Sequence, residues 1–333
     1  MIRPLASMLA LTAALAAGCK NQDQAGAGGA EGSASEGESP TKELGQKLNP
    51  YVECLNDFAN DVRHGRHTWL ETFPGKNGPE DKDLKHGSLY GPRTLRDTAK
   101  CFSGLDQAKT MKPSIPELEA AGQKWHEALA GLAPLYKTSN DYFEQGNYKD
   151  DKLAWAKKVH PDLMAKWAAF DEATSALDSH VEKLEDEIQN KELAYLEKSD
   201  GRKIRFLHHQ MLIKAKKLVK GAAVNTPAEI DLPSFTNAVA DYDKAWTEVW
   251  NYYTTNKKEV EDTVRAYWTI ESPGKDLLKD AKELMRRKRD NVKFSTGEKM
   301  TIGANNPESV EGHPARVIKS YNSLIDKSNG MNI

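Results

Sequence analysis

The stretch "LMAKWAAFDEATSALDSHVEKLEDEI", residues 163–188, indicates the fold class of this chain. The side chains of one stripe recur in it at alternating spacings of four and three: Leu163, Trp167, Phe170, Thr174, Leu177, Val181, Leu184 and Ile188. Such a heptad pattern is typical of long helices that pack nearly side by side. The stretch therefore predicts one long helix of a bundle.

Similar helical spacing marks most of the chain after residue 45. A second long stripe, entered through Asp231 and Pro233, consists of Phe235, Val239, Tyr242, Trp246, Val249, Tyr253 and Val260. An earlier stripe stops at Pro74 and Gly75, and its members are Tyr51, Leu55, Phe58, Val62 and Trp69. Further helices are predicted through Leu95, Phe102 and Leu105, after a capping Ser114, from Ser272-Pro273 to "MRRKRD", and from Pro314.

Two segments break the helical pattern. Residues 76–93 are rich in Gly, Pro and charge, which predicts a loop. "VKFSTGEKMTIG", residues 292–303, has extended or hairpin character. We therefore expect an all-α fold, a bundle of long antiparallel helices with one short irregular or hairpin arm near the C-terminus.

The N-terminus predicts export and lipidation. Arg3 precedes the apolar run "LASMLALTAALAAGC", which is too short to cross a bilayer comfortably. Ala16-Ala17-Gly18-Cys19 resembles the lipobox of bacterial lipoproteins, although the leucine lies one place early, at Leu15. This resemblance implies cleavage before Cys19 and acylation of that cysteine; a plain signal peptide is the alternative. Because lysine follows the cysteine, we expect attachment to the outer membrane, facing the periplasm.

The segment after Cys19 reads as a tether. It is rich in Gly, Ala, Ser and Glu and cannot bury enough apolar surface to fold. We expect a signal peptide over 1–18, a lipidated cysteine and flexible tether over 19–44, and a helical domain over 45–330.

Composition and cysteine usage narrow the function classes. The net charge is −2, with 38% hydrophobic and 29% charged residues, so the chain is a folded domain with no electrostatic case for nucleic-acid binding. Cys54 and Cys101 remain after the lipidation site. In an oxidising envelope compartment they favour a disulfide over a redox pair or metal ligands.

The stretch "YFEQGNYKDDKLAWAKKVHPDL", residues 142–163, interrupts two predicted helices. Gly146 and Asn147 end the first, Asp150 or Asp151 caps the next, and Pro161 kinks or restarts it. This favours an architectural role. The alternative is a ligand or partner surface made of Tyr142, Tyr148, Asp150, Asp151, Trp155 and His160.

Four segments carry a resemblance to a known family. "YFEQGNYKDDKLAWAKKVHPDL" resembles the central motif of the YiiG-like bacterial lipoproteins, whose domain has no known function. "KLNPYVECLND", "GSLYGPR" and "VEGHPARVIKSYNSLIDKSN" resemble its opening helix, following loop and closing helix, in matching order over 45–329. The resemblance implies a membrane-tethered helical domain and transfers no catalytic residue.

Metal ligation has weak support in the sequence. His64, His67 and Glu71 lie on one helical face. Gly65 lies between the two histidines and no second histidine cluster is evident, so a solvated polar face is favoured over a metal site. His208 and His209 are adjacent, so they point in different directions on a helix. We predict no metal and no cofactor.

No catalytic signature is complete. HExxH, P-loop, GxGxxG and GxSxG patterns are absent, and the SxxK match at Ser272–Lys275 lacks its partner motifs. A non-catalytic binding or scaffolding module of the cell envelope, contacting an envelope protein, is favoured over an enzyme. An enzyme or metal-handling protein whose site is assembled from distant helices remains open, as does an anionic-lipid-binding protein.

Two surplus features bear on partners. This part of the chain has more aromatic residues than one buried helical stripe needs: Trp246, Trp250, Tyr252, Tyr253, Tyr267 and Trp268. Packing in the core is favoured over an exposed aromatic groove. Residues 201–227 contain no acid but several basic residues, whereas the preceding helix is acidic. We expect internal charge pairing between the two helices rather than recognition of an anionic membrane.

Overall fold

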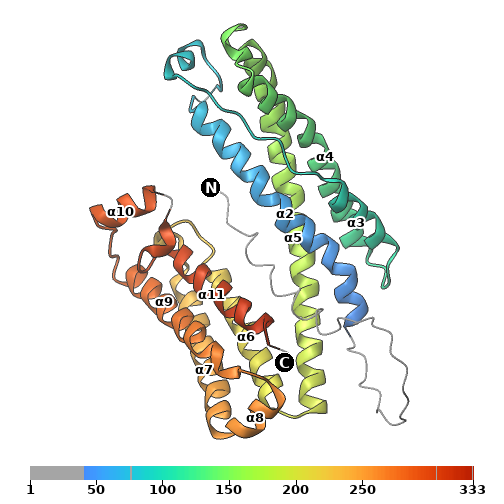
Figure 1. Ribbon diagram of the computed structural model, residues 1–333, viewed down its shortest axis with the longest axis vertical. Coiled ribbons are helices and arrows are strands. Elements are labelled where there is room, and N and C mark those ends of the chain that lie inside the picture. Colours follow the sequence, from blue (N-terminus) through green and yellow to red (C-terminus); the bar gives the residue numbers. More distant parts are fainter. Residues whose placement is uncertain (1–40, 76, 305, 332) are drawn as a thin grey trace. The chain divides into compact units, whose positions relative to one another are not determined.

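The computed structural model describes residues 41–333 except 76, 305 and 332 (Figure 1). The predicted signal peptide, Cys19 and nearly all of the tether lie outside these residues. The described part contains ten α-helices and no strand, which confirms the all-α prediction. No described helix is both long and apolar enough to cross a membrane.

The chain divides into two compact units, and the boundary falls inside helix α5. The N-terminal unit comprises residues 43–187, and the C-terminal unit comprises residues 188–333 with Thr41 and Lys42. The α-helices of the first unit are α2 Lys42–Thr72, α3 Ala99–Thr110, α4 Pro116–Glu144 and the first part of α5 Ala154–Ser199. Two short 3₁₀ helices join them, η1 Asp81–His86 and η2 Asn147–Lys149.

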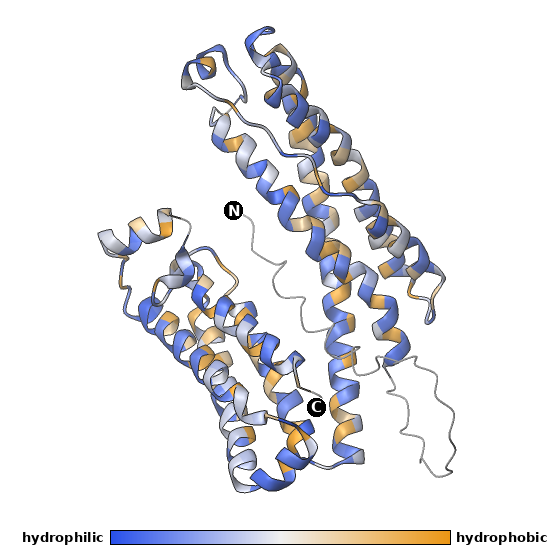
Figure 2. Ribbon diagram, viewed as in Figure 1, coloured by the Kyte–Doolittle hydropathy of each residue, from blue (hydrophilic) through white to orange (hydrophobic). Residues whose placement is uncertain are grey.

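The core of the N-terminal unit is built from the predicted stripes. Apolar positions recur among polar ones along α2, α4 and α5 (Figure 2). At its centre, the Tyr136 hydroxyl donates to the Val62 carbonyl at 2.7 Å and accepts from the Trp167 indole at 2.8 Å. Gly65 makes room for this arrangement, because a Cβ there would lie 2.4 Å from the Tyr136 ring. The buried hydrogen bonds tie α2, α4 and α5 together while satisfying the polar atoms.

The C-terminal unit contains the remaining helices. They are the end of α5, α6 Ile204–Gly221, α7 Leu232–Thr255, α8 Lys257–Thr263, α9 Glu271–Arg289, α10 Thr296–Gly303 and α11 Pro314–Asn329. The 3₁₀ turns are η3 Pro227–Glu229, η4 Tyr267–Ile270 and η5 Pro307–Ser309. Helix α6 packs on α7 and α11, and α9 packs on α7 and α11.

Core packing accounts for most of the aromatic surplus. Trp246, Tyr253 and Tyr267 are buried, and Trp250 stacks on Trp246 with ring centroids 5.5 Å apart. Tyr252 also packs against this core, partly buried. Trp268 is the exception, because most of its surface is exposed.

The structure corrects several local predictions. Helix α4 is not capped by Ser114: its N-cap is Ile115, because Pro116 supplies the first helical residue. Helix α5 does not restart at Pro161 but contains it. The predicted hairpin around residues 292–303 is instead helix α10. Ser295 and Glu298 form a capping box that satisfies its first amides.

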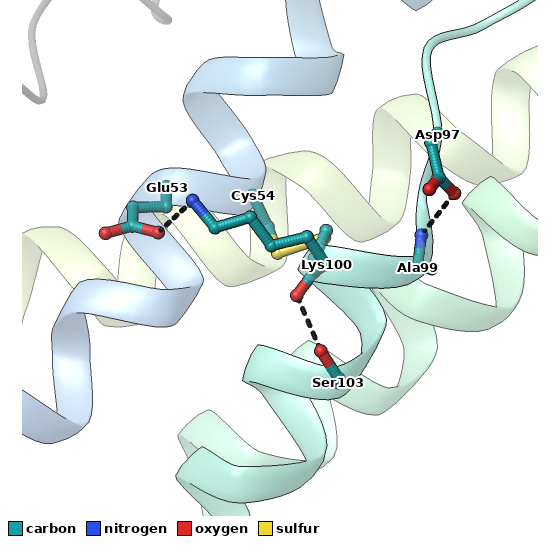
Figure 3. Close-up of a disulfide and its surroundings, with 7 residues drawn as sticks. Glu53, Cys54, Asp97, Ala99, Lys100 and Ser103 are labelled. Carbon is teal, nitrogen blue, oxygen red and sulfur yellow. Dashed lines mark hydrogen bonds and ion pairs between the residues drawn. A yellow bond between two sulfur atoms is a disulfide. The ribbon is translucent and has the colours of Figure 1, made fainter.

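The predicted disulfide joins α2 to α3 (Figure 3). The Cα atoms of Cys54 and Cys101 are 5.3 Å apart, across a sequence separation of 47 residues. Beside it, Lys100 forms an exposed ion pair with Glu53 at 3.8 Å, and the Asp97 carboxylate accepts from the Ala99 amide at 2.9 Å. In the chain-entropy model a loop of this size stabilises the folded state by roughly 4 kcal/mol.

Candidate functional site

The turn between α4 and α5 adopts a strained backbone. Gly146 has a φ of 73°, which glycine tolerates, but Lys152 and Leu153 have φ values of 54° and 64°. Left-handed conformations cost non-glycine residues about 1–2 kcal/mol each. The turn is held nonetheless, because the Leu153 side chain is fully buried.

Asp151 caps helix α5, as one of the two alternatives predicted. Its carboxylate accepts from the Trp155 amide at 3.0 Å and from the Tyr142 hydroxyl at 2.6 Å. Desolvation opposes ionisation, but the hydrogen bonds outweigh it and lower the pKa of Asp151. Burial, together with the Asp151 carboxylate, raises the pKa of Tyr142. Asp150 is exposed and makes no capping bond among the described residues.

Phe143 lies at the centre of an aromatic cluster that we name the Phe143 cluster. Its ring centroid is between 5.0 and 6.0 Å from the rings of the other members, which are Trp69, Phe73, Tyr142 and Tyr148. Trp155 covers Tyr142, with centroids 4.6 Å apart, and stays partly exposed. The cluster fixes the end of the unit at which α2 meets the α4–α5 turn.

His160 belongs to the same end of the unit. Its Nδ1 accepts from the Trp69 indole at 3.0 Å, and the two ring planes are nearly parallel, at 16°, with centroids 6.2 Å apart. Burial lowers the pKa of His160, which favours the neutral ring that this bond requires. Gly78, at a φ of 83°, approaches so closely that a Cβ there would lie 2.5 Å from the ring.

The segment between α2 and α3 packs over this end. Asp81 pairs with Lys157, and Gly91 lies against Ser139 and Phe143 so closely that a Cβ would clash with both. Tyr90, next to Gly91, is 63% exposed. Sequence reasoning missed Tyr90, because a loop residue has no periodic pattern to mark it.

The predicted surface residues are therefore brought to one end of the unit but differ in accessibility. Tyr142 and Tyr148 are buried, whereas Trp155 and His160 are half-buried. Asp150 and Asp151 are exposed. We use the name "end surface" for the accessible set, which consists of Tyr90, Asp150, Asp151, Trp155 and His160.

The histidines singled out for metal binding do not converge. His67 lies 3.2 Å from Glu71 on an exposed helix face, and across the described residues no group of three or more His, Cys, Asp or Glu could hold a metal ion. His208 and His209 are buried core residues. His208 Nδ1 lies 3.0 Å from the Tyr267 hydroxyl, and burial lowers the pKa of His208 to about 3.

The basic segment 201–227 forms ion pairs, as expected. Arg202 lies 3.3 Å from Glu197, and Arg205 lies 3.2 Å from Asp200. Carboxylates of later helices also contribute: Lys214 lies 2.7 Å from Asp241, Lys203 lies 3.3 Å from Glu259, and Arg202 lies 3.5 Å from Glu248. Helices α7 and α8 thus supply partners that the sequence reasoning had assigned to the preceding helix alone.

Comparison with known proteins gives a family but no activity. A family model described as a protein of unknown function, DUF3829, matches residues 42–330. The uncharacterized protein YiiG of Escherichia coli strain K12 is 23% identical over 290 residues, which cover 86% of this chain and 78% of that protein. No solved structure matches.

Proposed function

The chain belongs to the DUF3829 family of proteins of unknown function, and we propose that it is a lipid-anchored protein of the bacterial cell envelope. Its helical part is a non-catalytic binding or scaffolding module. The anchor is Cys19, which follows an apolar run and precedes a polar tether. Several acyl chains on one residue make a stable membrane anchor. The expected location is the outer membrane, facing the periplasm.

The anchor is tested by substitution at the lipidation site. Cys19→Ser should release the protein from membranes or block its processing, since serine has no thiol to acylate. Membrane fractionation and labelling with a tagged fatty acid measure this. If fractionation and labelling of the variant were unchanged, the proposal that Cys19 is acylated would be excluded.

The end surface is the observation that supports a binding role. Tyr90 is exposed and precedes Gly91, which lies against Phe143, and Trp155 is half-buried on Tyr142. Tyr and Trp held in place by packing are enriched among residues that dominate protein interfaces, because they bury large areas at low entropic cost. The partner we propose is another envelope protein.

A photo-crosslinking residue placed at position 90 tests this role in cells. We expect a defined adduct from Tyr90 that is absent from Lys124, an exposed position on α4 of the same unit. Loss of the adduct on Trp155→Ala would assign the contact to the end surface. Identical adducts from both positions, or none from either, would contradict the proposal. Metal analysis of the purified protein tests the metal-handling alternative.

A further inference from the structure

The junction between α9 and α10 concentrates positive charge. We name residues 286–304 the α9–α10 corner. It contains six basic and two acidic side chains, a surplus of four positive charges in a chain whose net charge is −2. Four of the basic residues, Arg286 to Arg289, form the last turn of α9. Part of this charge stabilises the C-terminal end of the helix dipole, but Lys293 and Lys299 lie beyond that helix.

The corner is held in place from one side. Arg287 lies 4.5 Å from the Phe294 ring centre and pairs with Glu298, which also caps α10. Gly312 approaches Arg287 so closely that a Cβ would lie 2.7 Å from its Nε. An isolated helix of eight residues is unstable in water. The contacts of Arg287 and Glu298 therefore help to stabilise the helical conformation of α10.

The other side of the corner exposes both apolar and basic side chains. Helix α10 has no buried residue. Met300 is 71% exposed and Val292 is 54% exposed, and they are two of the five exposed large hydrophobic side chains in the described part of the chain. Lys293 and Lys299 are exposed and have no carboxylate partner among the described residues. Apolar and cationic groups are thus presented together.

We infer that the α9–α10 corner binds the anionic surface of a lipid bilayer. Basic side chains attract anionic headgroups, while exposed apolar side chains enter the boundary between headgroups and acyl chains. Arg289 is paired with Asp290 and Arg286 with Glu283, both in exposed ion pairs. Such pairs contribute little in water, so the arginines can bind phosphate groups instead. Glu308 and Glu311 follow the corner and reduce the local charge surplus. Lys288 donates to the Ala228 carbonyl, so Lys293 and Lys299 are the cations of the described corner with neither a carboxylate nor a carbonyl partner.

Vesicle binding of unacylated protein tests this inference. The chain should begin at residue 20, so that neither the apolar N-terminus nor Cys19 contributes; all described residues are retained. Phosphatidylcholine vesicles with phosphatidylglycerol are compared with phosphatidylcholine alone. We expect binding to the anionic vesicles only, weakened by salt. Each basic side chain near such a surface contributes about fivefold to the partition coefficient.

Two variants and a matched control locate the contact. The triple change R289Q, K293Q and K299Q should weaken binding about 100-fold by removing three such contributions. In a separate variant, the double change V292S and M300S should also weaken vesicle binding, although the charge of the protein stays the same. The control K124Q, K158Q and K183Q removes three exposed lysines of the N-terminal unit and should leave binding unchanged apart from the effect of net charge. Circular dichroism verifies folding.

The outcomes separate this inference from the proposed anchor. Equal losses in the triple variant and its control would overturn it, as would no binding to anionic vesicles. Binding to soluble polyglutamate but not to vesicles would assign the corner to acidic proteins and also overturn it. In each case the Cys19→Ser fractionation result stands independently.

Discussion

The ammonium group of Lys47 lies 2.6 Å from the carboxylate of Glu119, and the lysine side chain is fully buried. The same nitrogen donates to the carbonyls of Ala108 at 2.9 Å and Met111 at 3.0 Å. One side chain of α2 thus satisfies carbonyls at the end of α3 and pairs with the first turn of α4. The hydrogen bond from Lys47 is the main cause that lowers the pKa of Glu119.

Lys47→Ala should lower the free energy of unfolding by about 3 kcal/mol. Lys47 is fully buried, whereas the Glu119 side chain is 21% exposed, so loss of the lysine leaves the carboxylate partly hydrated but leaves two carbonyls without their donor. Urea unfolding at neutral pH measures the change. Lys100→Ala, at an exposed lysine of α3, is the control and should change stability by less than about 0.5 kcal/mol. A Lys47→Ala effect as small as the control's would show that the network contributes nothing.

Stability should fall in acid because His208 is held neutral. The pKa of His208 in the folded state is about 3, against 6.5 for a histidine in water. Below pH 6.5 the unfolded chain therefore binds a proton that the folded chain does not, and the free energy of unfolding decreases until the pH reaches the folded-state pKa. Between pH 7 and pH 4.5 the expected loss from this residue is about 2–3 kcal/mol.

His208→Gln isolates that contribution, because His160, His209 and His313 have pKa values shifted in the same direction. The variant should be less stable than the unmodified protein at pH 7 but should lose less stability on acidification. Chemical unfolding at both pH values gives the comparison. Equal pH dependence in the two proteins would contradict a buried neutral His208.

Gly78→Ala and Gly87→Ala form a matched pair around the end surface. Both glycines have φ values near 80°, but a Cβ at Gly78 would clash with His160, whereas one at Gly87 would meet nothing within 4 Å. Gly87 has a φ of 81° and a ψ of −122°, a mirror-β conformation that favours glycine, so Gly87→Ala should cost about 1–3 kcal/mol from backbone strain alone. Gly78→Ala should cost more and should disturb the hydrogen bond between Trp69 and His160. Unfolding experiments, with tryptophan fluorescence as the probe, measure both.

The Cys54–Cys101 disulfide should stabilise the protein by up to about 4 kcal/mol. Protein treated with a reductant, or carrying Cys54→Ser and Cys101→Ser, should unfold at a lower urea concentration. Mass spectrometry with and without alkylation shows whether the bond forms in cells. Two free thiols in protein isolated from the envelope would refute the pairing.

The helices could be predicted from the sequence because their burial pattern is local. Leu163, Trp167 and Phe170 recur every three or four residues, and the structure buries all three. Helix α10 has no buried residue, so its sequence carries no apolar stripe of helical period. Because that signal is missing, the sequence alone predicted an extended or hairpin segment there. His208 and His209 were expected to point in different directions, and both are buried: His208 lies against Tyr267 of η4, and His209 lies near Gln189 and Glu192 of α5.

The candidate site could be predicted only in part. The 142–163 stretch is contiguous, so its turn and its capping aspartate leave a local signature. The contact between Trp69 and His160 joins residues 91 positions apart, and Lys47 reaches Glu119 across 72 positions. A periodic pattern reports which face of a helix is buried but not which residue lies opposite it. The exposure of Tyr90 and the close approach of Gly78 to His160 could therefore be recognised only in the packed structure.

The disulfide also changes what a protease can accomplish. The segment between α2 and α3, in which Tyr90 is exposed, lies between Cys54 and Cys101 in the sequence. A single cut there opens the polypeptide but releases neither fragment, because the sulfur bridge still joins them. On a denaturing gel the nicked molecule would migrate as two pieces only after reduction. The anchor that we propose at Cys19 would thus retain both fragments, and the domain would remain at the membrane after the backbone has been cut.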